Sequence, residues 1–221
     1  MGSELDPREF SASARRHLRH YVSGLGLSLD ALAADFPGPG LVDPADADRR
    51  VDHFRRLLQL CRDLHVPRAI VPLGGFDDPR TGELAGELLE VVAESAAASE
   101  IDTLVVDPTQ EPAKLADRLR RLGCPQLHLL VDTAFLPTAS ALDPAGDLVR
   151  SLHLRDVRRG PGGFEEVPFG QGQVDFVDLL ARLEAGAAAA TLAIRHDGRD
   201  GVDALRQGRD YMHQVIGRLA R

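Results

Sequence analysis

The 221-residue chain lacks several features that mark particular classes of protein. Its two cysteines, Cys61 and Cys124, are too few for a disulfide scaffold and are not spaced as metal ligands. No apolar run approaches the about 18 residues that a membrane span requires, and the first residues are neither basic nor apolar. The sequence therefore predicts a cytoplasmic protein that makes no contact with a membrane.

The chain also has fewer positive than negative side chains. It contains 26 lysine and arginine residues and 34 aspartate and glutamate residues, which gives a formal net charge of −8. A surface that neutralises nucleic-acid phosphates needs the opposite balance, so no nucleic-acid partner is expected. The hydrophobic content of 43% and the charged content of 27% are typical of globular proteins. Because no break in composition divides the chain, residues 1–221 are expected to form a single domain.

Short β-like runs alternate with longer helical runs along the whole chain. In the helical runs, apolar residues recur with a period of about 3.6, as in the stripe from Val51 to Leu64. Strict alternation predicts a parallel sheet covered by helices, either a barrel or a doubly wound sheet. The expected strands are Leu27–Ala33, Arg68–Leu73, Ile101–Val106, Leu127–Val131, Ser151–Arg155 and Ala190–Arg195.

If the sheet closes into a barrel, alternate residues of each strand point into it. Bulky aliphatic residues such as Leu152 and Leu154 then pack under the helices, and their neighbours face inward. Barrel enzymes keep their chemistry at the carboxyl ends of the strands. The structural alternative is that each polar residue there only ends a strand or caps a helix. The ionisable residues expected on the inner face near these ends are Asp107, Asp132, His153 and Arg195.

The most specific motifs lie in Ser151–Leu183, SLHLRDVRRGPGGFEEVPFGQGQVDFVDLLARL. This segment reads as a strand ending in His-x-x-Asp, a glycine-rich loop, and Gly-x-Gly-x-Val-Asp-Phe at the start of a helix. Upstream, LLVDTAFL reads as a strand ending in Asp-Thr. With these motifs the chain resembles the xylose-isomerase-like barrels, which include sugar-phosphate isomerases and epimerases, over nearly its whole length.

The resemblance implies an α/β fold of the TIM-barrel type, shortened at the N-terminus. Aligned by motif, the first strand and helix are missing, so about seven strands are expected. The segment Gly2–Asp6 would be a remnant of the second strand. A barrel that lacks a strand has two open edges, which a homodimer could cover.

The resemblance also implies one divalent metal ion (Mn, Mg, Co or Zn) held by Glu, Asp, His and Glu from four consecutive strand ends. Carried over by position, the ligands fall on Asp107, Asp132 and His153, whereas the second Glu falls on Arg195. The two Glu positions, Asp107 and Arg195, are also the catalytic positions of the family. Arginine stays protonated, so Arg195 can neither ligate a cation nor act as a base.

Our hypothesis for the site follows from this substitution. Two carboxylates in a barrel interior repel each other unless a cation lies between them, and the guanidinium of Arg195 could pair with Asp132 or Asp107 in place of a metal. No cofactor is then expected. Alternatively, Arg195 turns aside to bind a substrate phosphate, with help from Arg159, and leaves a three-ligand metal site.

Two more inward-facing residues, His128 and Arg155, are candidates for substrate binding, although His128 could equally be a core histidine with satisfied hydrogen bonds. The glycine-rich segment Gly160–Gly172 could be a mobile lid, a phosphate cradle or a plain surface loop.

Three functions remain. The resemblance implies isomerisation or epimerisation of a small sugar or sugar phosphate, with a degraded metal site. The substituted site residues favour a non-catalytic, metal-free barrel that binds a small carbohydrate or a protein partner. An endonuclease IV-like activity fits least, since it needs more His and Glu ligands and a basic face for DNA.

Overall fold

The structure is a computed structural model that describes residues 10–36, 38, 40–107, 111–186, 189–197 and 201–219. Its contacts divide the chain into two compact units. The first comprises residues 1–110 and 119–128, and the second comprises residues 111–118 and 129–221. The single domain expected from the sequence thus stays a prediction.

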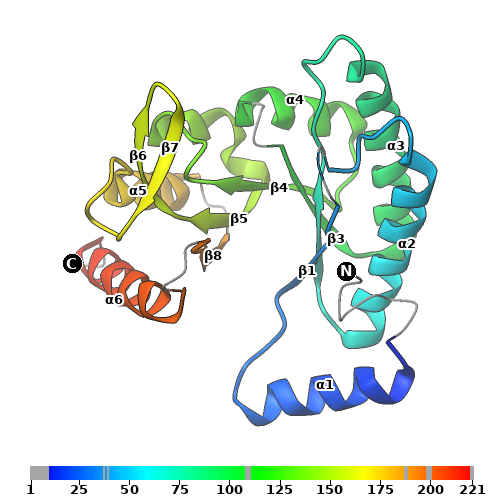
Figure 1. Ribbon diagram of the computed structural model, residues 1–221, viewed down its shortest axis with the longest axis horizontal. Coiled ribbons are helices and arrows are strands. Elements are labelled where there is room, and N and C mark those ends of the chain that lie inside the picture. Colours follow the sequence, from blue (N-terminus) through cyan, green and yellow to red (C-terminus); the bar gives the residue numbers. More distant parts are fainter. Residues whose placement is uncertain are drawn as a thin grey trace. The chain divides into compact units, whose positions relative to one another are not determined.

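The first unit is built of parallel strands and the helices that connect them (Figure 1). Strand β2 pairs in parallel with β1 on one side and with β3 on the other. Helices α2 and α3 lie side by side, and the buried face of α2 is the apolar stripe that the sequence predicts. The bounds are α1 Ala12–Gly24, β1 Ala31–Ala33, α2 Ala47–Leu64, β2 Arg68–Pro72, α3 Gly82–Ser99 and β3 Asp102–Val106.

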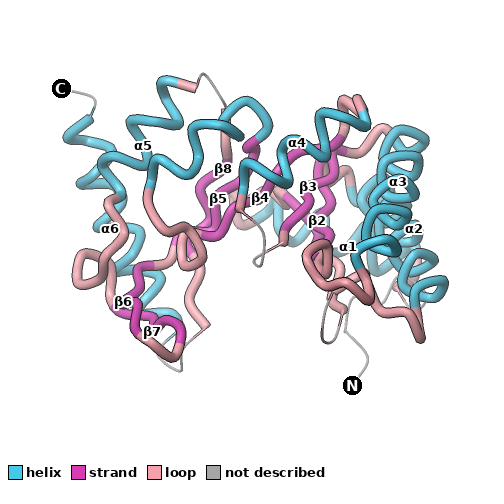
Figure 2. The backbone as a smooth tube through the Cα atoms, turned by 90° about the horizontal axis from the view of Figure 1, so that it is seen from above, coloured by secondary structure: helices cyan, strands magenta, loops and turns pink. Residues whose placement is uncertain are grey.

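The second unit continues the pattern with three neighbouring strands, β4, β5 and β8 (Figure 2). Strand β5 pairs in parallel with both β4 and β8, and the register sets Asp132 opposite His153. The bounds are β4 Leu127–Asp132, η1 Ala139–Leu148, β5 Val149–Leu154, β6 Asp156–Gly160, β7 Gly163–Val167, α5 Phe176–Ala185, β8 Thr191–Ile194 and α6 Gly201–Leu219. Helix α4, Pro112–Leu122, falls partly in each unit, and the first two residues of β4 also belong to the first unit.

Each of the six expected strands is present, although β1 is confined to the last three residues of the predicted Leu27–Ala33. The expected remnant Gly2–Asp6 lies outside the described residues. In the part of the chain that the structure describes, no helix has both the length and the apolarity needed to cross a bilayer.

The glycine-rich segment Gly160–Gly172 is a loop only in part, which corrects the sequence prediction. Its first half forms β7, which pairs antiparallel with β6 in a hairpin. The pair Gly160 and Gly163 closes the hairpin, and Gly163 has φ +119°, a conformation that a residue without Cβ adopts at little cost. The expectation of a loop gave too much weight to these glycines and too little to Phe164–Val167.

Candidate functional site

The candidate site begins where β4 and β5 end side by side. Thr133, which follows the last residue of β4, is fully buried and joins the two strand ends. Its hydroxyl donates to the carbonyl oxygen of Arg155 (2.6 Å) and accepts from the Arg155 amide (2.8 Å). Its own amide donates to the carbonyl oxygen of His153 (3.0 Å). The Asp-Thr motif therefore fixes Asp132 beside the end of β5.

Arg155 is the cation of this site, and its side chain is only 7% exposed. Its Nε donates to Asp132 Oδ1 (3.1 Å) and its Nη2 donates to Asp132 Oδ2 (2.7 Å), a two-pronged contact that matches the planes of both groups. Its Nη1 donates to Asp197 Oδ2 (3.0 Å) and lies 3.8 Å from Glu166 Oε2. We call Asp132, Arg155, Glu166 and Asp197 the arginine cluster.

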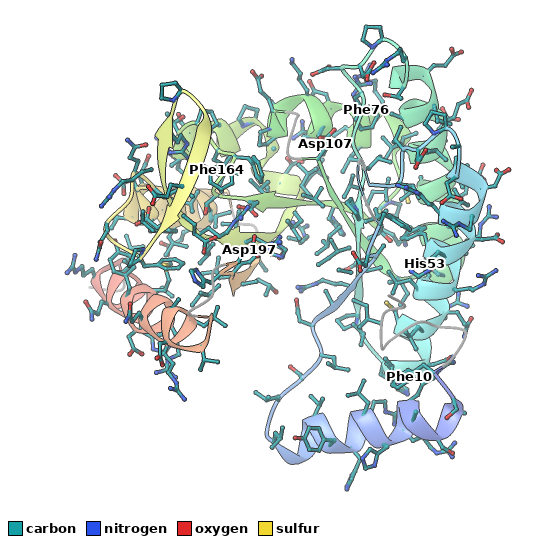
Figure 3. The ribbon with its side chains drawn as sticks, in the orientation of Figure 1. Phe10, His53, Phe76, Asp107, Phe164 and Asp197 are labelled. Atoms are coloured by element: carbon teal, nitrogen blue, oxygen red, sulfur yellow. The ribbon has the colours of Figure 1, made fainter. Side chains whose placement is uncertain are left out.

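The cluster draws its carboxylates from three different elements. Asp132 ends β4, Glu166 lies on β7, and Asp197 follows β8, as the labelled Asp197 in Figure 3 shows. Glu166 also bonds to Nδ1 of His196 and accepts from the Asp197 amide (3.4 Å). The hairpin is thus attached to the ends of β5 and β8 through Glu166.

Two phenylalanines lie against the guanidinium of Arg155. Its central carbon is 5.6 Å from the ring centre of Phe135 and 5.3 Å from that of Phe164. The two rings meet edge to face, with centres 5.2 Å apart. Both distances to the cation are within the range of an attractive cation–π contact. Figure 3 shows Phe164 on the β6–β7 hairpin.

Arg195 does not pair with Asp132, which was one of the two partners, Asp132 or Asp107, that the hypothesis allowed. Its Nε donates to Asp197 Oδ1 (3.0 Å), its amide donates to the carbonyl oxygen of Leu154 (3.0 Å), and its side chain is half exposed. Arg155 pairs with Asp132 in its place, because it comes directly after β5, the neighbour of β4. The inner face was expected to contain Arg155, but as a substrate-binding residue.

His128 lies away from the carboxyl ends of the strands. Its Nε2 is 3.6 Å from Asp102 Oδ1, and Asp102 begins β3. His128 and Asp132 are four positions apart in the sequence, which is about 13 Å along an extended strand. His128 is thus at the start of β4 rather than at its carboxyl end, since alternation fixes the face of a strand residue but not its depth.

Asp107 follows β3 directly and is buried. It belongs to the first unit. Its position at a strand end is the one that the sequence predicts.

Arg159 is turned toward the segment between β4 and η1. Its Nη2 donates to the carbonyl oxygens of Thr133 (3.1 Å) and Leu136, and its amide donates to Gln173 Oε1 (2.9 Å). A cavity of about 250 Å³ adjoins it, lined by Thr133, Leu136, Pro137, Thr138, Ala139, Arg159, Gln173, Val174, Asp175, Asp178 and Leu179. The guanidinium is thus engaged with backbone carbonyls.

Burial lowers the pKa of His153 below its ordinary value of about 6.5. The nearby Arg195 and Arg155 act in the same direction, whereas Asp132 and Asp197 oppose the shift. His153 is therefore neutral at pH 7.

We expect the imidazole resonances of His153 to titrate below pH 6.5, because burial penalises the charged form. Since the unfolded chain binds this proton more readily, the stability contributed by a neutral His153 is present above pH 6.5 and is lost as the pH falls below it. Two-dimensional NMR with His153→Gln for assignment measures the titration. A midpoint above 6.5 would show that Asp132 and Asp197 dominate.

The donor set does not fit the divalent metal that the resemblance implies. Both carboxylate oxygens of Asp132 accept hydrogen bonds from Arg155, and Oδ1 also accepts from the Ala134 amide (3.0 Å). The position of the second Glu ligand is Arg195, which carries the wrong charge. Within the described ranges, no group of three or more His, Cys, Asp or Glu side chains could hold a metal ion.

Sequence reasoning missed Glu166, Asp197 and Phe164 as members of the site. The glycine content of their segment predicts a loop at Glu166 and Phe164, and Asp197 is separated from the predicted Arg195 by one residue. The available signal for a strand here was the aromatic Phe164 and the β-branched Val167, residue types that favour strands, although the two glutamates between them break any alternation.

Comparison with known proteins gives the family. The model of the family described as "Xylose isomerase-like TIM barrel" matches residues 2–215. The Escherichia coli (strain K12) protein named "Putative L-ribulose-5-phosphate 3-epimerase SgbU" is 28% identical over 184 residues. The match covers 73% of this chain but only 63% of that relative's length.

Solved structures show the same fold at low sequence identity. The xylose isomerase domain protein of Planctomyces limnophilus aligns with a TM-score of 0.81 and 16% identity, over 96% of this chain and 83% of that one. A xylose isomerase-like TIM barrel protein of Mycobacterium smegmatis, solved in complex with magnesium, aligns with a TM-score of 0.76 and 15% identity, over 94% and 79%.

Another similar structure, the IOLI protein, has a binding zinc atom and aligns with a TM-score of 0.76 and 14% identity, over 96% of this chain and 84% of that one. Divalent metals therefore occur among the structural relatives. The α/β TIM-type fold predicted from the sequence is confirmed, and the match over residues 2–215 shows that the chain belongs to the xylose isomerase-like TIM barrel family.

Proposed function

We propose that this protein is a metal-free member of its family that binds a small carbohydrate at the arginine cluster. The relatives whose names state a substrate support the class of ligand, since they are epimerases of sugars or sugar phosphates. The observation that carries the metal-free proposal is the two-pronged contact of Arg155 with Asp132.

This contact opposes a dication for electrostatic reasons. A metal bound to Asp132 would displace two charge-assisted hydrogen bonds and would then lie beside a buried guanidinium. Of the two positions that transfer protons in the family, one is Arg195, which cannot act as a base. The site can therefore hold a sugar, but it lacks the second carboxylate of the family's reaction.

Metal content tests the proposal. Protein produced in medium supplemented with manganese, zinc and cobalt is expected to carry only trace metal by mass spectrometry, because Arg155 already occupies the Asp132 carboxylate. Arg155→Gln, which frees that carboxylate, is the matched variant and is expected to retain more metal than the wild type. One tightly bound ion per wild-type chain would contradict the proposal.

A second candidate function is epimerisation of a sugar phosphate, with a metal (Mn, Mg, Co or Zn) at Asp107, Asp132 and His153. It is favoured by the register that sets Asp132 opposite His153 and by the named activity of the Escherichia coli relative. Turnover of L-ribulose 5-phosphate that depends on added Mn²⁺ and is abolished in His153→Gln would support it.

We also propose that the chain forms a cytoplasmic homodimer. Helix α1 has no buried residue, and Tyr21, Leu25 and Leu27 are exposed in and after it. Among the described strands, β1 pairs with β2 alone, so it presents an edge. Sedimentation equilibrium is expected to give a dimer, and Tyr21→Ser with Leu27→Ser is expected to shift it to monomer. A wild-type monomer at all concentrations would contradict this.

A further inference from the structure

Two aromatic side chains at the arginine cluster are exposed although they are in contact with each other. Phe135 is 46% exposed and Phe164 is 37% exposed, and their rings meet edge to face. A single exposed apolar residue needs no explanation, but an aromatic pair placed over a buried guanidinium is a surface of defined chemistry. In the folded protein this aromatic surface is exposed to water. A ligand that covers it gains binding free energy from the burial of apolar area.

The groups around the pair are hydrogen-bond acceptors. Asp197 has a half-exposed side chain, and Glu166 retains lesser exposure on the adjacent hairpin. Ionised carboxylates only accept hydrogen bonds, and each oxygen has more than one lone pair. A ligand that suits this arrangement has an apolar face for the rings and hydroxyl donors at its edge, which is the chemistry of a sugar or cyclic polyol.

The charges of the cluster indicate that this ligand carries no phosphate. The cluster has three carboxylates, on Asp132, Glu166 and Asp197, against the guanidinium of Arg155 and that of the adjacent Arg195, which pairs with Asp197. Every nitrogen of the Arg155 guanidinium already faces a carboxylate. An incoming phosphate would meet an excess of negative charge.

The neighbouring Arg159 does not offset this charge, because its guanidinium donates to the carbonyl oxygens of Thr133 and Leu136. Using Arg159 for a phosphate would leave these carbonyls without that donor, at the cost of a lost hydrogen bond. The described part of the chain thus offers an uncharged ligand better complementarity than a phosphate ester.

We propose that Phe135 and Phe164 form the stacking surface for the ring of an uncharged sugar or polyol, whose hydroxyls donate to Asp197 and Glu166. The proposal rests on the proposed carbohydrate-binding function and narrows its ligand class. It assigns the two phenylalanines a binding role.

Titration calorimetry with matched pairs of ligands tests the inference. The probes are free ketopentoses and ketohexoses, L-ribulose among them, each with its phosphate ester, and myo-inositol as a cyclic polyol. At least one uncharged probe is expected to bind at least about ten-fold more tightly than its phosphate ester. Phe135→Ala and Phe164→Ala are each expected to weaken that binding by about ten-fold, and Phe164→Tyr to retain it.

The controls separate this inference from the function on which it rests. Ile216→Ala removes an exposed apolar side chain on α6 and is expected to leave binding unchanged. Thermal unfolding checks that the phenylalanine variants fold. Tighter binding of the phosphate esters, or unchanged binding by both alanine variants, would overturn the inference while carbohydrate binding stands. Binding of none of the probes would overturn both.

Discussion

Arg155→Ala is expected to lower the free energy of unfolding by about 3–5 kcal/mol, because it leaves buried carboxylates without their cation. Asp132 is as buried as Arg155, and Glu166 lies in a largely buried position beside it. The intact pair need not stabilise the fold by that amount, since burying two charges has its own cost. Removal of one partner is expensive because the desolvated charge of the other remains.

Variants at the same position separate charge from geometry. Arg155→Lys keeps the positive charge but loses the planar fork, so it is expected to recover only part of the loss. Arg206→Ala removes an exposed arginine paired with Asp203 and is the matched control, with an expected change of at most about 0.5 kcal/mol. Urea unfolding monitored by circular dichroism measures all three. A loss below about 1 kcal/mol for Arg155→Ala would show that water solvates Asp132 in the folded protein.

Most of the fold could be predicted from the sequence because it depends on local patterns. The apolar stripe of α2 and the aliphatic runs of β2 to β5 specify which face of each element is buried, whatever its neighbours are. The β6–β7 hairpin could not be predicted in the same way. Its residues are mostly charged or glycine, and pairings such as Arg158 with Glu165 form only when the chain reverses.

The site was predicted less well than the fold. Its contacts depend on which of several long side chains reaches a given carboxylate. Strand alternation places Arg155 and Arg195 on the same side of their strands but does not say which guanidinium takes which carboxylate. The outcome depends on Asp197, which accepts from both arginines, and on Glu166, which arrives from the hairpin. Asp197 lies outside the motif segment Ser151–Leu183, and Glu166 lies in its glycine-rich stretch, to which no chemistry of a carboxylate was assigned.

The sequence reveals the His-x-x-Asp motif but not the structural role of its aspartate, Asp156. Asp156 is only 1% exposed, and its carboxylate accepts from backbone amides distant in sequence. Oδ2 accepts from Gly170 (2.8 Å) and Gly172 (2.9 Å), and Oδ1 accepts from Val174 (3.3 Å). It thereby holds the glycine-containing segment that leads into α5.

Asp156→Ala is therefore expected to destabilise the protein by about 4 kcal/mol, since several buried amides lose a charged acceptor at once. Asp156→Asn is expected to cost about half as much, because its amide keeps one acceptor oxygen. Gly172→Ala tests the same contact by changing Gly172, which lies against the Asp156 carboxylate. A Cβ there would lie 2.0 Å from Asp156 Oδ1 and 2.7 Å from the Val157 amide, so the carboxylate or the backbone must shift.

Urea unfolding of the three variants checks this role of Asp156, with Asp203→Ala as the control on an exposed carboxylate. Asp156→Ala and Gly172→Ala together are expected to cost less than the sum of their separate effects, since both disrupt one contact. An Asp156→Ala variant within about 1 kcal/mol of the wild type would show that water replaces the carboxylate. In that event the segment 170–174 would be held by α5 and the hairpin rather than by Asp156.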